Sequence, residues 1–190
     1  MSFMRPMLCG AAAFALLAAF LLQTPSVADD LAKTRFGAVE APSKGPPRVI
    51  GYYSRGCIEG AEALPADGPA WQAMRLSRNR VYGHPSLIDF VETLSRQAPG
   101  LGFNGLLIGD LSQPRGGPML YGHTSHQVGL DVDIWLRQMP KRRLTLEERD
   151  TLPFQSVLTA DETAVDPDRL SAPLMMVMKA AALDDRVERI

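Results

Sequence analysis

The sequence predicts an α+β domain in which a small antiparallel sheet is flanked by helices. Short stretches of strand character are mixed with amphipathic helical stretches, without regular strand–helix–strand alternation and without an internal repeat. The 190 residues are 46% hydrophobic, which is enough for one globular domain and hardly for two. The chain has 20 basic and 21 acidic residues, so it lacks the basic excess that is typical of nucleic-acid-binding proteins.

The first 28 residues have the pattern of a secretory signal peptide. Arg5 precedes an apolar run over 7–22, and Pro25 and small residues follow up to Ala28. That run is shorter than the roughly 20 residues that span a bilayer. We therefore expect cleavage after Ala28, export to an oxidising compartment, and no membrane attachment of the mature chain. Cys57 then remains as a lone cysteine, which is either a buried thiol or half of a disulfide whose partner is absent from this chain.

Three short strands are expected, over 48–54, 105–111 and 131–136. The first and third alternate polar and apolar residues, and the second is a short apolar run. Residues 29–48 are rich in Pro, Gly and Lys, which predicts an extended N-terminal arm before a domain over 49–190.

Residues 55–71 are expected to be a loop that ends at a packing anchor, Trp71. The loop over 112–122 is rich in Gly and Pro.

Three helices are expected between and after the strands. Ser86 can cap a helix that continues to Gln97 with an apolar stripe, and "TLEE" (145–148) fits a capping box. A third helix over 171–185 opens with a cap and an early proline. Residues 186–190 have the character of a strand that begins there.

The stretch "GHTSHQVGLDVDIWL" (122–136) holds two histidines and two aspartates. On a helix, His126 and Asp133 would be about 10 Å apart, too far to share one ion. A tight turn over 128–131, with Gly129 supplying the unusual backbone angles, would instead make them cross-strand neighbours about 5 Å apart. Asp131 points the same way as Asp133 on an extended strand, so spacing alone does not choose between them.

Three separated blocks resemble one family. "SRNRVYGHPSLI" (77–88), "LLIGDLSQPRGG" (106–117) and "SHQVGLDVDIWL" (125–136) are similar, in this order, to the penicillin-insensitive murein endopeptidases. These belong to a zinc peptidase group with a His-x2-Gly-x3-Asp core, shared with D-Ala-D-Ala dipeptidases and hedgehog domains. His126 and Asp133 fit that core.

The resemblance implies a hedgehog-like fold and a periplasmic zinc endopeptidase that cleaves D-Ala–meso-diaminopimelate cross-links of peptidoglycan. His126 and Asp133 would then bind Zn²⁺, and His123 would bind a second ion or lie next to the first. Asp161 would be the aspartate of a second metal pair, although no histidine follows it. The counterpart of Cys57 in the family pairs with a late cysteine that this chain lacks.

The family takes its third zinc ligand from a downstream His-x-His segment, and no histidine follows His126 here. We therefore expect the N-terminal portion of an endopeptidase, weakly active or inactive alone, with no general base assigned within it. The alternative is a non-catalytic module that binds peptidoglycan or metal. Whether the protein forms a homodimer stays open.

Other polar residues are weaker candidates for the site. Arg115 in the Gly/Pro loop could bind a substrate carboxylate or be solvated. His84 either caps the following helix or lines the cleft. Asp110, at the end of its strand, is expected to be structural.

Overall fold

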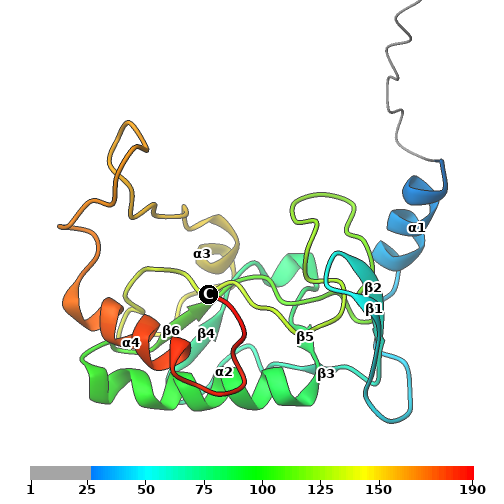
Figure 1. The fold of residues 1–190 in the computed structure, drawn as a ribbon, viewed down its shortest axis with the longest axis horizontal. Helices are drawn as coiled ribbons and strands as arrows, with labels where there is room; N and C mark the ends of the chain where they lie inside the picture. Colours follow the sequence, from blue (N-terminus) through cyan, green and yellow to red (C-terminus); the bar gives the residue numbers. More distant parts are fainter. Residues whose placement is uncertain (1–26) are drawn as a thin grey trace, which may run out of the picture.

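The computed structural model describes residues 27–190 (Figure 1). Most of the predicted signal peptide, over 1–26, lies outside the described residues. Across 27–190 no helix combines the length and the apolarity that a bilayer crossing requires.

The described residues form an α+β fold, as predicted. The helices are α1 (Val27–Gly37), α2 (Pro85–Gln97), α3 (Leu146–Thr151) and α4 (Ala172–Ala182), with short 3-10 turns η1 (Leu76–Arg78) and η2 (Ala98–Leu101). The strands are β1 (Arg48–Tyr52), β2 (Arg55–Glu59), β3 (Glu62–Ala63), β4 (Trp71–Ala73), β5 (Tyr82–Gly83) and β6 (Leu106–Ile108). They pair as three two-stranded sheets, antiparallel for β1–β2 and β3–β5 and parallel for β4–β6, instead of forming a single antiparallel sheet.

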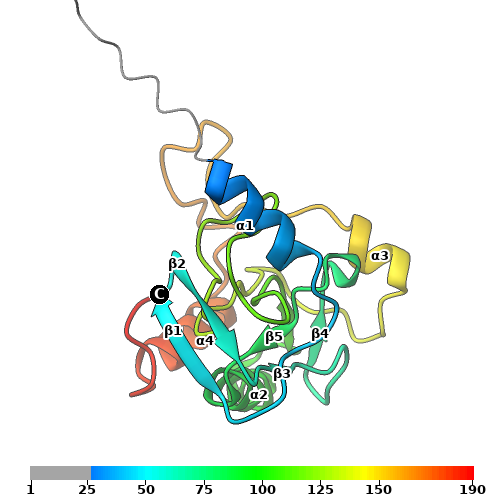
Figure 2. The same cartoon turned by 90° about the vertical axis from the view of Figure 1, so that its right-hand side faces the viewer.

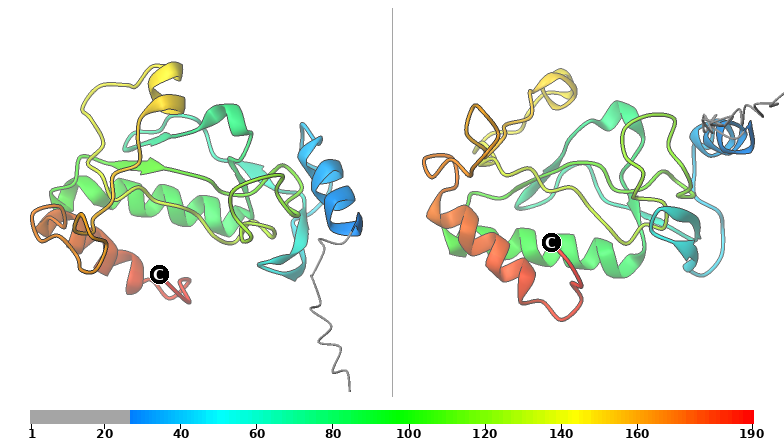
Figure 3. Two further views of the ribbon diagram at one scale, coloured as in Figure 1. Left: turned by 90° about the horizontal axis from the view of Figure 1, so that it is seen from above. Right: turned by 45° about the horizontal axis from the view of Figure 1, so that its top comes forward.

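The core lies between the β4–β6 pair and helices α2 and α4. Figure 1 shows α2 running along one side of β4 and β6, and Figure 3 shows α4 lying against α2. Leu87, Ile88, Val91 and Leu94 recur at helical spacing and are all buried, which confirms the predicted apolar stripe. Trp71 is buried as well and donates its indole N–H to Pro65 O at 2.9 Å.

Helix α2 begins two residues earlier than expected. His84, not Ser86, is the N-cap, and its Nδ1 accepts a hydrogen bond from Ser86 N at 3.2 Å. Pro85 takes the first helical position, where its missing N–H costs nothing. The residue predicted as the cap therefore lies inside the first turn.

The N-terminal part differs from its prediction in two places. Residues 29–37, expected to be extended, belong to helix α1, because the prolines of this region all come after Gly37. Strands β2 and β3 lie within the predicted loop over 55–71. Tyr52 pairs with Arg55, so a two-residue turn closes the β1–β2 hairpin. The turn was not predicted because its two residues are not of the Asn-Gly type that is typical of such turns. Figure 2 shows α1 and this hairpin near one another.

The C-terminal elements largely follow the predictions. Thr145 and Glu148 form the expected capping box, and Ser171 caps α4. Residues 186–190 are not a strand. Arg186 turns back instead and forms ion pairs with Asp89 (2.7 Å) and Asp184 (2.8 Å).

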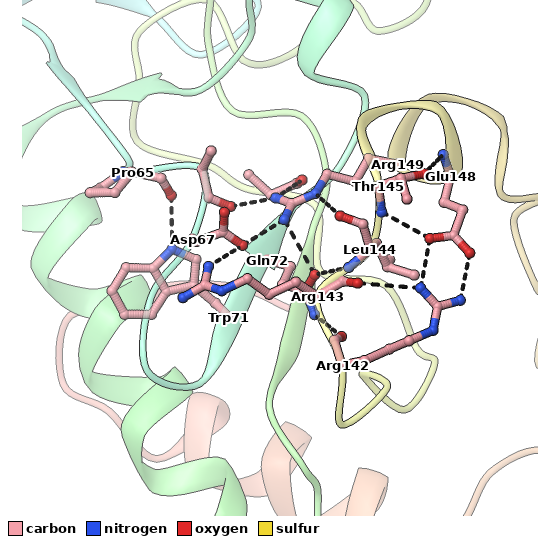
Figure 4. Close-up of polar contacts among 12 residues, drawn as sticks. Pro65, Asp67, Trp71, Gln72, Arg142, Arg143, Leu144, Thr145, Glu148 and Arg149 are labelled. Carbon is pink, nitrogen blue, oxygen red and sulfur yellow. Dashed lines mark hydrogen bonds and ion pairs between the residues drawn. The ribbon is translucent and has the colours of Figure 1, made fainter.

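A buried polar network, which we call the Arg149 cluster (Arg149, Asp67 and Gln72), attaches α3 to β4 (Figure 4). Arg149 donates from Nη2 to Asp67 Oδ1 at 2.5 Å and to Gln72 Oε1 at 3.3 Å. Its Nε and Nη1 bind backbone carbonyls, and Gln72 Oε1 also accepts from Leu144 N at 2.7 Å. This network holds the 142–151 segment in place.

Candidate metal centre

The segment 131–136 brings Asp133 to the end of β6. Gly109 N donates to Asp133 O at 2.7 Å, and Asp133 N donates to Asp110 O at 3.0 Å. Gly109 permits this approach, because a Cβ there would lie 3.0 Å from the Cβ of Asp133. The strand predicted here is extended backbone with an isolated antiparallel bridge at Ile134.

The loop that carries His126 is fixed to the β1–β2 hairpin by Gln127. Gln127 Oε1 accepts from Gly56 N at 3.2 Å, and its Nε2 donates to Ser54 O at 2.8 Å. Gln127 N also donates to Tyr53 O at 3.2 Å. This role of Gln127 was not predictable from the sequence, because its partners in the hairpin lie about 70 residues away and no local pattern indicates them.

The predicted reversal occurs at Gly129, whose φ is 66°, but it is not a ladder hairpin. His126 itself has a left-handed backbone (φ 60°), and its N–H donates to Asp131 Oδ2 at 3.0 Å. His126 and Asp133 are therefore not cross-strand partners. Their side chains nevertheless meet, with His126 Nε2 lying 3.4 Å from Asp133 Oδ1.

His123, His126 and Asp133 form one group, which we call the metal group. One ligand atom from each lies within 4.8 Å of the others. His123 Nε2 is 3.3 Å from Asp133 Oδ2, and the two imidazole rings meet edge to face with centroids 4.8 Å apart. His126 is buried, whereas His123 and Asp133 are partly exposed. Two imidazoles and a carboxylate converging on one point are a donor set suited to zinc.

Asp110 lies next to this group and is nearly fully buried. Its Oδ2 accepts from Arg78 Nη1 (2.9 Å) and Arg80 Nη1 (2.8 Å), and it lies 3.6 Å from His123 Nε2. Two guanidinium groups thus neutralise Asp110, which supports the structural role expected for it. Both arginines lie in the block over 77–88, but no pattern there predicted that they bind Asp110.

Opposite charges shift the pKa values within the metal group. Burial disfavours charged His126, but its hydrogen bond with Asp133 and the charges of Asp131 and Asp133 outweigh burial and raise the His126 pKa. Burial likewise raises the pKa of Asp133, yet the hydrogen bond with His126 and the charges of His126, His123 and Arg78 lower it overall. The group therefore favours an ionised carboxylate that is ready to bind a cation.

The metal group opens onto a cleft of about 1150 Å³. Asp110, His123 and Asp133 line its polar part, next to Arg75 and Arg78. Apolar side chains of α2, α4 and the 130–136 segment line the rest, among them Phe90, Leu94, Leu130, Ile134 and Val177. Such a cleft combines polar, ionisable side chains with an apolar wall, a lining that suits an extended ligand.

Residues 49–190 match the family model described as penicillin-insensitive murein endopeptidase. The chain belongs to this family. Curated relatives that carry the same name include a Klebsiella pneumoniae protein, 40% identical over 90% of this chain and 62% of its own length. One from Escherichia coli is 40% identical over 84% of this chain and 58% of its own. One from Salmonella paratyphi B is 39% identical over 94% and 63%. The chain thus spans about three fifths of the length of these murein endopeptidases.

Two of the weaker candidate residues lie outside the cleft lining. His84 caps α2, with its Nδ1 2.8 Å from Ser86 Oγ, and its N–H donates to Gly129 O at 2.8 Å. Arg115 is exposed and contributes its backbone carbonyl to Ile58 N at 3.1 Å. The structure gives both residues local roles in the fold and does not bring them to the metal group.

Asp161 and Cys57 are also apart from the metal group. Asp161 is exposed and accepts from the hydroxyls of Thr159 (2.5 Å) and Thr163 (2.9 Å) in the 155–166 loop, which Figure 1 shows at the far end from the 117–125 loop. Cys57 lies in β2 and forms no disulfide within the described residues. Burial and the charge of Glu59 raise the pKa of its thiol, so it is a poor nucleophile there.

Proposed function

We propose that this protein is a zinc-dependent endopeptidase that hydrolyses the peptide cross-links of peptidoglycan in the periplasm, at D-Ala–meso-diaminopimelate bonds. The observation that carries the proposal is the metal group, whose His123 and Asp133 line an open cleft in a chain of the murein endopeptidase family.

The spacing of the side chains fits zinc. Two atoms bound to one zinc ion at about 2.0–2.1 Å and at the tetrahedral angle lie roughly 3.3 Å apart. The His126–Asp133 and His123–Asp133 atom pairs, at 3.4 and 3.3 Å, have this separation. His126 and Asp133 would hold the ion, and His123 would complete the set or bind a second ion.

Zinc bound there would lower the pKa of a water ligand towards about 7 and polarise the scissile carbonyl. The chain supplies the surroundings. Asp133 is ionised at neutral pH, and its lowered pKa extends the ionised form to more acidic pH. Apolar side chains line the wall of the cleft next to it. Arg78 donates one guanidinium N–H to Asp110, and its side chain is about one-third exposed in the cleft. Its other guanidinium N–H groups can therefore donate to a substrate oxygen.

The 190-residue chain alone is expected to hydrolyse cross-links weakly. It contains three histidines, and His84 is used as the cap of α2. A mononuclear site would therefore depend on His123 as its third protein ligand. We assign no general base among the described residues, since no glutamate or further histidine belongs to the metal group.

The test measures zinc stoichiometry and the release of muropeptides from purified sacculi, for the protein and for Asp133→Ala. One bound zinc and slow cleavage, both lost in Asp133→Ala, would support the proposal. Zinc binding with attachment to sacculi but without any cleavage would favour a non-catalytic binding module. Failure of the wild-type protein to bind zinc would overturn the proposed function.

A further inference from the structure

Asp131 makes three contacts with His126, two at the ring nitrogen Nδ1 and one at the backbone N–H, whereas Asp133 faces Nε2. Its Oδ2 lies 3.0 Å from His126 Nδ1 and accepts the His126 backbone N–H, also at 3.0 Å. The backbone carbonyl of Asp131 lies 3.3 Å from the same Nδ1. The other carboxylate oxygen, Oδ1, is buried and has no hydrogen-bond partner in the described part of the chain.

These contacts favour Nδ1 over Nε2 as the protonated ring nitrogen of neutral His126. Both neighbours of Nδ1 are oxygen acceptors, and neither an ionised carboxylate nor a carbonyl can donate. Nε2 also faces an acceptor, Asp133 Oδ1, but at 3.4 Å, whereas Asp131 places two oxygens at 3.0 and 3.3 Å from Nδ1. The favoured neutral ring therefore has its hydrogen on Nδ1 and a lone pair on Nε2. That lone pair is on the nitrogen 3.4 Å from Asp133 Oδ1, where a shared cation would lie.

The same oxygen also stabilises the backbone that aims the ring. His126 has φ 60°, a conformation that residues other than glycine rarely adopt. Accepting its N–H through Asp131 Oδ2 satisfies this strained peptide within the loop. Because ring and backbone are bound by one atom, rotating the imidazole or relaxing the loop would break a charged hydrogen bond.

We propose that Asp131 is the positioning residue of the metal centre: it fixes the Nδ1–H tautomer and the ring orientation of His126, so that Nε2 is presented to a divalent cation. The assignment of the cation rests on the proposed function. Asp131 and Asp133 then have separate tasks, the first holding the imidazole and the second sharing the ion. A carboxylate behind a metal-bound histidine fixes its tautomer and makes it a better ligand.

The tautomer can be measured without metal. Long-range ¹H–¹⁵N correlation spectra of the metal-free protein, recorded at about pH 9 where an ordinary histidine is neutral, report which nitrogen of His126 is protonated. Wild type is expected to show Nδ1–H, and Asp131→Ala a shift towards Nε2–H. An unchanged Nδ1–H in Asp131→Ala would overturn the proposal, because the backbone carbonyl alone would then set the tautomer.

Asp131→Asn separates the hydrogen bonds from the charge and guards against misfolding of the alanine variant. Because Oδ1 has no partner, the amide NH2 can take its place while the amide oxygen keeps both bonds to His126. This variant is expected to retain Nδ1–H. Loss of Nδ1–H in a folded Asp131→Asn protein would contradict the assigned geometry.

Zinc titration gives the second readout. Asp131→Ala is expected to raise the zinc Kd about 10–100-fold, and Asp131→Asn by less. Asp161→Ala, at an exposed aspartate bonded to threonines, should leave Kd unchanged. An unchanged Kd in Asp131→Ala would overturn the positioning role while leaving the proposed function standing. Wild type that binds no zinc yet shows Nδ1–H would overturn the proposed function alone.

Discussion

The Arg149 cluster and the metal group are both built around aspartates, yet they differ in how completely their polar atoms are used. All five guanidinium N–H groups of Arg149 can be paired with acceptors, and its side chain is 4% exposed. Asp133 and His123 are 43% and 37% exposed, and both face the cleft. A saturated, enclosed cluster holds the fold together, whereas an unsaturated group at a cleft has capacity left for a ligand.

The largest effect is expected from breaking the saturated cluster. Arg149→Met would remove a buried donor from several backbone carbonyls, and would leave Asp67 Oδ1 with the exposed Arg143 and Gln72 Oε1 with Leu144 N. We expect the free energy of unfolding to fall by about 3–5 kcal/mol, as measured by urea denaturation.

Arg143 provides the matched control, because it binds the same oxygen, Asp67 Oδ1, at 2.7 Å, but its side chain is 68% exposed. Arg143→Ala should cost no more than about 1 kcal/mol. Equal losses in both variants would contradict the distinction between saturated and exposed contacts.

Changes in the metal group should affect ligand binding more than folding. His126→Ala and Asp133→Asn are expected to weaken zinc binding by more than about 100-fold, since losing a supporting residue alone costs 10–100-fold. Zinc at 100 times the wild-type Kd should stabilise wild type by about 2.7 kcal/mol and each variant by less than about 0.4 kcal/mol. Thermal unfolding with and without zinc checks this, and equal stabilisation of Asp133→Asn would show that zinc binds elsewhere.

Gly129 should affect both folding stability and zinc binding, because it lies in the loop between His126 and Asp133. Its φ is 66°, and an added Cβ would lie 3.1 Å from Gly83 Cα and from His84 N. Gly129→Ala is expected to cost about 1–2 kcal/mol in folding stability and to weaken zinc binding. Unchanged denaturation and zinc titration curves would mean that the loop adopts another conformation.

The smallest expected effect is the pH dependence contributed by Asp67. Burial raises its pKa, but the hydrogen bond and charge of Arg149, with those of Arg143, lower it below the usual value. A lowered folded-state pKa means that this stabilisation is present above the unfolded pKa of about 3.9 and is lost as pH falls further. The stability difference between wild type and Asp67→Asn should therefore narrow below about pH 4. A constant difference down to pH 3 would argue against the pairing.

The sequence predicted the features whose physical cause is local. The apolar stripe of α2, the capping box at Thr145 and the proximity of His126 to Asp133 all follow from residues within a few positions of one another. Helix α1 was missed because the composition of 29–48 was averaged over a stretch whose prolines all come late. The β1–β2 turn was missed because its two central residues carry no turn signature.

The supporting residues were not predictable in the same way. Arg149 reaches Asp67 across 82 positions and Gln127 reaches Ser54 across 73, and neither contact leaves a periodic trace in the chain. Asp131 was recognised but could not be told from Asp133, because alternation places both on one face. The separation of their tasks depends on the left-handed backbone at His126. That conformation is not predictable from the sequence, because residues other than glycine rarely adopt it.

The bond from His84 N to Gly129 O gives the start of α2 a second use. That amide proton can exchange with deuterated solvent when its hydrogen bond to Gly129 O breaks, so its exchange rate reports opening of the loop. The exchange rate of the His84 amide, which lies outside the cleft lining, would thus report how often the loop that carries His126 opens. It would also show whether zinc lowers that opening rate.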